Sequence, residues 1–172
     1  MRRDRFRLMA EAARLAGLAL AVLWAGLLAS ITLGHLEARW SPLSNALSDL
    51  GVVGAPTRPV FNATLAASAV LLAATAASLR DRLLLTASLL ESLVAVIDES
   101  LGLAHYLIAV ALFAALAAYV WLRCSRIASA VMIASWIPYL ARLVAAAPPE
   151  LLNAAIASAC VARRAGLWRS AS

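Results

Sequence analysis

The sequence predicts an all-α polytopic membrane protein, a bundle of six transmembrane helices with one short helix in an outer loop. The chain has 172 residues, of which 64% are hydrophobic, and its mean hydropathy is +0.87. A soluble domain has roughly 45–50% apolar residues. Uncharged runs recur along the chain, and its fifteen basic residues, all arginines, lie mostly in short groups at the ends of these runs. No internal repeat divides the chain, so residues 1–172 are predicted to form a single domain.

Each predicted span is an apolar run bounded by charged or helix-breaking residues. The first run is too long for the apolar part of a signal peptide and lacks a cleavage site, so it is interpreted as an uncleaved span. The third run is short and contains Glu91. The fifth contains Pro138, which predicts a kink, and the short sixth run requires tilting partners or a locally thin bilayer. The predicted spans are about 15–33, 60–79, 83–97, 101–122, 127–147 and 149–162.

The arginines predict the orientation of these spans. With the N-terminus inside, every arginine except Arg39, Arg58 and Arg142 falls on the inner side, which is the positive-inside distribution. We therefore expect a multi-pass protein of the cell membrane with both termini in the cytoplasm. The net charge of +6 then reflects topology, and no nucleic-acid partner is expected. The expected partners are membrane lipids, together with another membrane protein or a second copy of this chain.

The predicted outer loop between the first two spans, His35–Asn62, is rich in polar and turn-forming residues. Ser41 is a good helix cap, Pro42 suits the first helical position, and Gly51 suits a left-handed residue just past a helix end. These signals predict a short capped helix over 42–50. Its apolar residues recur at helical spacing, so one face can lie on the bundle.

The predicted topology collects carboxylates and imidazoles at the outer face. Such groups act as acid and base in hydrolysis or ligate a divalent metal, but they also cap helices and meet solvent without any further role. We expect Asp49 and His105 to lie within hydrogen-bond or shared-ligand reach, with Glu99 or His35 as third member. No pair forms a specific motif such as H-E-x-x-H, so the sequence requires no cofactor. The candidate catalytic residues are Asp49, His105, Glu99 and His35, and the candidate ligands of any divalent metal are these four and Asp98.

Glu91 lies inside the third predicted span, where an ionisable side chain costs about 2.5–3.5 kcal/mol and normally faces a partner or a cavity. Arg142, at similar depth in the fifth span, is its predicted partner in a buried ion pair. A proton or ion pathway is the alternative. Cys124 and Cys160 lack metal-ligand spacing and are interpreted as small apolar side chains.

Short motifs in three places resemble the six-span membrane family catalogued as domain of unknown function 998. They are Ser48-Asp49-Leu50-Gly51 in the first outer loop, Phe61-Asn62 at the start of the second span, and His105 opening the fourth. Ile97-Asp98 stands where the family has a Phe-Pro pair before the histidine. The resemblance covers most of the chain and implies the six-span topology and a role for Asp49 and His105. It implies no reaction, because the activity of that family is not established.

Two functions of different classes fit these observations. The first is a non-enzymatic membrane protein, either a structural or accessory subunit or a binding module for lipid or a partner, and it is favoured by the absence of a strong catalytic motif. The alternative is an intramembrane hydrolase that acts on lipid head groups through the outer cluster of carboxylates and histidines. The sequence does not decide whether the chain is an enzyme.

Overall fold

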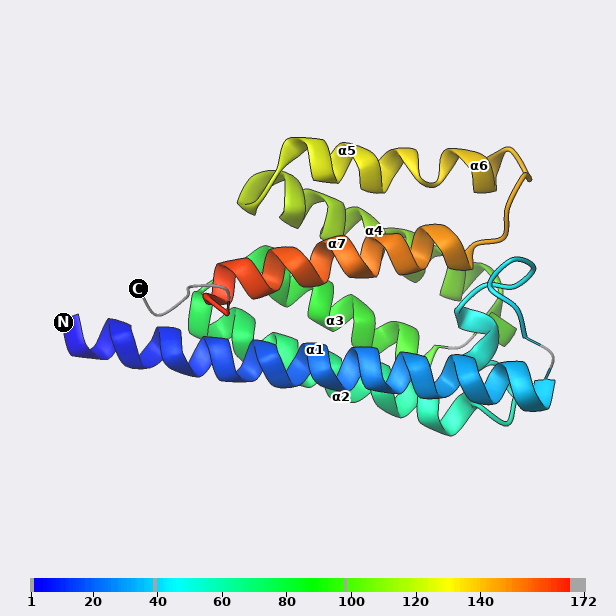
Figure 1. Cartoon of the computed structure of the whole chain (residues 1–172), viewed down its shortest axis with the longest axis horizontal. Helices are drawn as coiled ribbons and strands as arrows, with labels where there is room; N and C mark the ends of the chain where they lie inside the picture. Colours follow the sequence, from blue (N-terminus) through cyan, green and yellow to red (C-terminus); the bar gives the residue numbers. More distant parts are fainter. Residues whose placement is uncertain (1, 39, 98, 168–172) are drawn as a thin grey trace.

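A computed structural model describes residues 2–38, 40–97 and 99–167 of the chain (Figure 1). Within this part the protein is α-helical and contains no strand, which confirms the predicted all-α class. The α-helices are α1 (Arg2–Ala38), α2 (Arg58–Leu79), α3 (Arg82–Val96), α4 (Leu103–Arg123), α5 (Arg126–Ala134), α6 (Ile137–Leu140) and α7 (Ala147–Ala165), and the 3-10 helices are η1 (Ser48–Gly51) and η2 (Glu99–Leu101).

The helices lie along one axis and alternate in direction (Figure 1). α1, α3 and the α5–α6 pair run away from the end where the chain begins, and α2, α4 and α7 run back toward it. We call that end the arginine end, since the α2–α3 and α4–α5 turns and the end of α7 place Arg80, Arg82, Arg123, Arg126, Arg163 and Arg164 there. The opposite loop end holds residues 40–57, η2 and the start of α7.

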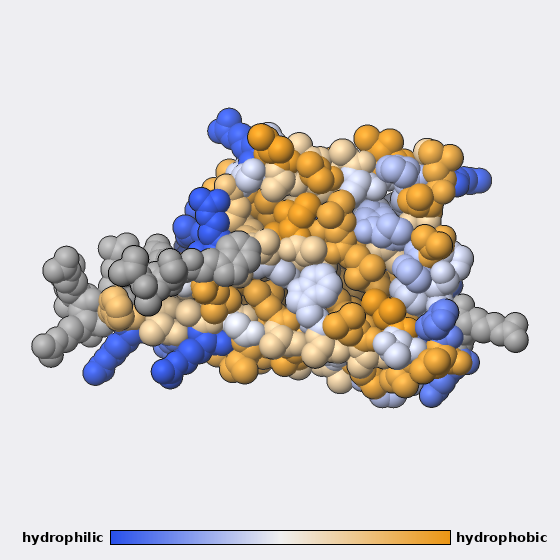
Figure 2. Space-filling model, viewed as in Figure 1, coloured by the Kyte–Doolittle hydropathy of each residue, from blue (hydrophilic) through white to orange (hydrophobic). Residues whose placement is uncertain are grey.

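Three helices are long and apolar enough to cross a membrane, namely residues Phe6–Glu37 within α1, all of α2 and all of α4. Figure 2 shows hydrophilic residues gathered toward the two ends of the molecule, with mostly hydrophobic residues over the face between them. α3 has 15 residues and α5 only 9, so neither reaches the length of a typical span. This composition is consistent with a membrane protein.

α1 and α2 approach each other closely because Gly26 has no side chain. A Cβ at this position would lie only 1.9 Å from Oγ1 of Thr64 on α2. Small residues at helix interfaces permit this kind of backbone contact in membranes. The two helices form one side of the bundle, and α5 and α6 lie on the opposite side (Figure 1).

The prediction of a helix over 42–50 is wrong. The chain forms a turn at 42–44, and only η1 is helical. Side chains of the loop bind the backbone groups that a helix would use, since Asn45 Oδ1 accepts from Ser41 N at 3.1 Å and Asp49 Oδ2 accepts from Ala46 N at 3.0 Å. Asn, Asp and Ser offer the backbone this alternative to helix formation, and here it prevails over the helix-end signals.

Gly51 is needed for packing and not for a left-handed turn. Its φ is not among the positive values that the structure gives for other glycines. A Cβ on Gly51 would lie 2.5 Å from Asn62 Oδ1 and 2.8 Å from Phe61 Cδ1. The backbone of η1 therefore lies directly against the first turns of α2, which brings together two of the short motifs noted in the sequence.

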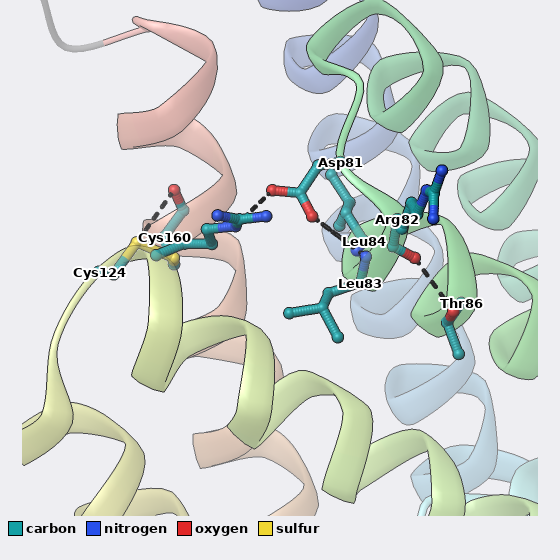
Figure 3. Close-up of polar contacts among 8 residues, drawn as sticks. Asp81, Arg82, Leu83, Leu84, Thr86, Cys124 and Cys160 are labelled. Atoms are coloured by element: carbon teal, nitrogen blue, oxygen red, sulfur yellow. Dashed lines mark hydrogen bonds and ion pairs between the residues drawn. A yellow bond between two sulfur atoms is a disulfide. The ribbon is translucent and has the colours of Figure 1, made fainter.

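Cys124 and Cys160 form a disulfide between the end of α4 and α7, with their Cα atoms 5.8 Å apart (Figure 3). Their interpretation as separate apolar side chains is therefore wrong. The pairing depends on α4 and α7 lying side by side, which a sequence separation of 36 residues does not reveal. Next to it, Arg123 Nε binds Asp81 Oδ2 at 2.8 Å, and Asp81 also caps α3 by accepting from Leu83 N at 3.1 Å.

Candidate functional site

A cavity of about 920 Å³ lies between α4 and the helices α5, α6 and α7. We call it the lateral cavity. Its α4 wall consists of residues that recur every three or four positions from Gly102 to Leu122, and many of them are alanines. Trp136, between α5 and α6, packs against Phe113 of this wall and against Tyr139 of α6, with ring centroids 4.9 and 5.7 Å apart. The volume is within the range of about 300–1,000 Å³ that is usual for small-molecule sites.

The polar part of the lateral cavity lies at the loop end. Elsewhere in the wall, the Ser129 hydroxyl and the Asn153 amide already donate hydrogen bonds within the bundle, and the remaining residues are apolar or aromatic. η1, η2, α4, α6 and α7 each contribute to the polar part. We call this set the loop-end cluster, and it consists of Ser48, Glu99, His105, Tyr106, Tyr139 and Glu150.

Glu150 belongs to the first turn of α7, directly after two prolines that suit the start of a helix. Its Oε2 accepts a hydrogen bond of 2.6 Å from Leu47 N, just before η1. Ala147 N also donates to the Asn45 carbonyl at 3.2 Å. These two bonds fix the start of α7 against the loop and hold the Glu150 carboxyl at the cavity. Glu150 is not among the candidate residues predicted from the sequence, so its place in the site was missed.

Asp49 and Glu99 contact each other through their side chains. Asp49 Oδ2 accepts from Ala46 N and from Asn45 Nδ2, each at 3.0 Å, so it has the backbone-capping role of a structural residue. Burial is the strongest influence on Glu99 and raises its pKa above the ordinary value of 4.5. The bond with Asp49 raises this pKa further, while a bond with Ser48 and the charge of His105 lower it. A hydrogen bond between two carboxyl groups requires a proton on one of them.

His105 is only 7% exposed and lines the lateral cavity from the first turn of α4. Its Nδ1 lies 2.6 Å from the carbonyl oxygen of Ile97. A carbonyl only accepts, so Nδ1 carries the hydrogen, and in the neutral ring Nε2 is then an acceptor. The part of the chain that the structure describes has no hydrogen bond between Asp49 and His105. Glu99 interacts with both of them, because its side chain is hydrogen-bonded to Asp49 and the charge of His105 lowers its pKa.

The remaining candidates lie elsewhere. His35 is exposed near the end of α1, with Nδ1 3.4 Å from the Trp40 carbonyl oxygen, and it does not line the lateral cavity. Asp98 lies outside the described residues. Among the residues that are described, no three His, Cys, Asp or Glu side chains are grouped so that they could hold a metal ion.

The predicted ion pair between Glu91 and Arg142 is wrong. Helix α6 ends at Leu140, so Arg142 lies exposed in the connection to α7 with φ of 59°. Glu91 is 8% exposed within α3 and accepts a hydrogen bond from the Ser68 hydroxyl of α2. Glu91 also lines a smaller cavity of about 130 Å³ inside the bundle, which shares His105 and Glu150 with the lateral cavity.

The break between α5 and α6 is held by Asn153 of α7. The kink predicted at Pro138 is confirmed, because α5 ends at Ala134 and α6 begins at Ile137. Asn153 is 1% exposed, and its amide donates to the Pro149 carbonyl, the Ser135 hydroxyl and the Met132 carbonyl at 2.8, 3.0 and 3.3 Å. Nothing in the sequence indicated this role of Asn153.

Comparison of the chain with protein-family models, with curated proteins and with solved structures finds no match. The resemblance to domain of unknown function 998 therefore stays a prediction.

Proposed function

We propose that this chain is a six-span integral membrane protein of the cell membrane that binds one amphipathic, lipid-like molecule in the lateral cavity. The observation that carries the proposal is the cavity itself, which is apolar over most of its wall and polar at the loop end. A lipid has the same division between its chain and its head group. The loop-end cluster would bind the head group, and the wall formed by α4 and α5 would contact the chain.

The length of the cavity supports a chain-like ligand. Its α4 lining extends from Gly102 to Leu122, and at 1.5 Å per residue this is about 30 Å, which matches the hydrocarbon thickness of a bilayer. Helix α4 is also one of the helices apolar enough to cross a membrane. A ligand lying along α4 would therefore have the orientation of a lipid in the surrounding bilayer.

The directions of the helices and the positions of the arginines support the six-span topology. α3, the α5–α6 pair and α7 alternate in direction with the three long apolar helices, so each would cross the membrane if those helices do. The turns between helices at the arginine end carry Arg80, Arg82, Arg123 and Arg126, whereas the connections at the loop end carry fewer arginines. The positive-inside rule therefore assigns the arginine end, with both termini, to the cytoplasm. The loop-end cluster would then face outward.

Narrowing the cavity tests this proposal. Ala118 lines the lateral cavity, and Ala118→Phe would fill part of it. The control is Ala67→Phe, because Ala67 is exposed on α2 and lines neither cavity. Native mass spectrometry of protein released from neutral micelles would count the bound lipid. We expect one retained lipid in the wild type and the control, and at least tenfold less in Ala118→Phe. Equal retention in all three proteins would refute a site in this cavity.

A hydrolase that acts on lipid head groups is the second candidate. One observation favours it, namely that the Ile97 carbonyl orients His105 so that Nε2 is free to act as a base beside Glu99. Binding without chemistry is better supported, because Asp49, the expected partner of His105, is used by the loop. Incubation with mixed phospholipids decides between them. Head-group release that is lost in His105→Gln would establish the hydrolase, and retention of intact lipid would exclude it.

A further inference from the structure

We infer that the molecule bound in the lateral cavity carries a positively charged nitrogen in its head group. This inference rests on the proposed function and specifies its ligand. Three features of the cavity support it, namely the balance of hydrogen-bond donors and acceptors at the loop end, the charges of the lining, and the aromatic rings of the wall.

Apart from the hydroxyls of Ser48, Tyr106 and Tyr139, which both donate and accept, the polar groups of the loop-end cluster act mainly as acceptors. Glu99 and Glu150 contribute carboxyl oxygens from η2 and α7. His105 donates through Nδ1 to the Ile97 carbonyl, so in the neutral ring Nε2 is an acceptor. The amide of Asn153, which also lines the cavity, already donates to groups within the bundle. The ligand that best complements such a set carries donors or a positive charge.

Charge leads to the same conclusion. No arginine is among the described residues that line the lateral cavity. Arg142 is the basic residue closest in sequence to the α6 wall, and it is exposed outside that lining. Glu99 and Glu150 thus lie at one end of an apolar cavity with Asp49 beside them and only His105 as a basic group. A cation in this place would favour the ionised form of these carboxyl groups and be attracted to it, whereas an anionic head group would disfavour that form and be repelled by it.

Aromatic side chains complete a site for an ammonium group. Trp136 and Tyr139 pack with their rings at 79°, and Tyr106 lines the same cavity from α4. The faces of such rings attract cations and are the usual binding surface for quaternary ammonium groups. The molecule already contains one contact of this kind, because Arg126 lies 5.6 Å from the ring centroid of Trp121 near the arginine end of the cavity.

The test compares amphiphiles that share one chain and differ in head-group charge. Dodecyltrimethylammonium, dodecanol and dodecanoate would each be titrated into the full chain in neutral micelles, with binding followed by native mass spectrometry. We expect the trimethylammonium compound to bind at least tenfold more tightly than dodecanol, and dodecanoate to bind most weakly. The double variant Glu99→Gln/Glu150→Gln keeps the volume of both side chains and removes their charge. It should lose at least tenfold in trimethylammonium affinity without changing dodecanol binding.

Glu37→Gln is the matched control, since Glu37 is an exposed carboxylate near the end of α1 that does not line the cavity. It should change neither affinity. Equal binding of trimethylammonium and dodecanol, both reduced by Ala118→Phe, would overturn the inference and leave the proposed function intact. If Ala118→Phe reduces the binding of none of the three, the proposed function itself fails.

Discussion

Replacement of Asn153 by Leu should separate the α5–α6 wall from α7. The substitution keeps the size of the side chain and removes the amide that binds Met132, Ser135 and Pro149. The amide has two hydrogens, so it makes the equivalent of two full bonds, and at about 0.5–1.5 kcal/mol each the loss is about 1–3 kcal/mol. Equilibrium unfolding in neutral micelles would measure this change. The variant should also bind less lipid, because Asn153 lines the lateral cavity.

Ser92→Ala is the control for this substitution. Ser92 bonds only to the Ser88 carbonyl of its own helix, at 3.1 Å, so its removal leaves no group of another helix without a partner. We expect it to cost less than about 0.5 kcal/mol. If Asn153→Leu lowers the free energy of unfolding by no more than this control, the idea that Asn153 holds the broken helix is incorrect.

Three other predictions concern single contacts. Burial raises the pKa of Glu99 above 4.5, so the stability from its protonated form is present below that pH and is lost as the pH rises. Glu99→Gln should flatten the fall in melting temperature that occurs as the pH rises above about 4.5. Glu91→Gln and Ser68→Ala should show a coupling energy above about 0.5 kcal/mol in a double-mutant cycle, because their side chains are hydrogen-bonded, and additive effects would contradict that bond. Cys124 and Cys160 should react with maleimide only after reduction, and alkylation of the untreated protein would show that the disulfide is absent.

The disulfide also bears on topology. Disulfides persist mainly in oxidising compartments, while the arginines around Cys124 assign the same end of the bundle to the cytoplasm. After reduction, an impermeant maleimide applied to one side of sealed vesicles would show on which side of the membrane Cys124 lies. Labelling from the cytoplasmic side supports the orientation proposed here, and labelling from outside reverses it.

The helical class and the order of the helices could be predicted because they follow from local composition. An apolar run, the arginines that bound it and a proline such as Pro138 each determine the backbone only within a few residues of their own position. The positions of α2, α4 and the α5–α6 break therefore agree with the predicted ones. The loop helix failed because Asn45 and Asp49 bind the backbone of their own loop, and sequence alone does not show whether such residues cap a helix or replace it.

The site was predictable only in part. Glu99 and His105 were found because ionisable residues near span ends must come together at one face. Glu150 and Asn153 were missed because their roles depend on contacts of α7 with the loop and with α5. The pairing of Glu91 with Arg142 failed for a similar reason, since the depth of Arg142 was counted along a helix that in fact ends at Leu140.

The site of attachment of a photoreactive chain tests the central claim most directly. An amphiphile with a trimethylammonium head and a diazirine at the far end of a dodecyl chain would be irradiated with the protein in neutral micelles and mapped by mass spectrometry. An extended dodecyl chain of about 15 Å covers about ten residues of α4 at 1.5 Å per residue. If the head group lies at the loop-end cluster, the adducts should therefore concentrate on Phe113 and Ala114, which line the middle of the cavity. Adducts that are equally frequent on Val70 and Val96, exposed residues of α2 and α3 that line neither cavity, would contradict lipid binding in the lateral cavity.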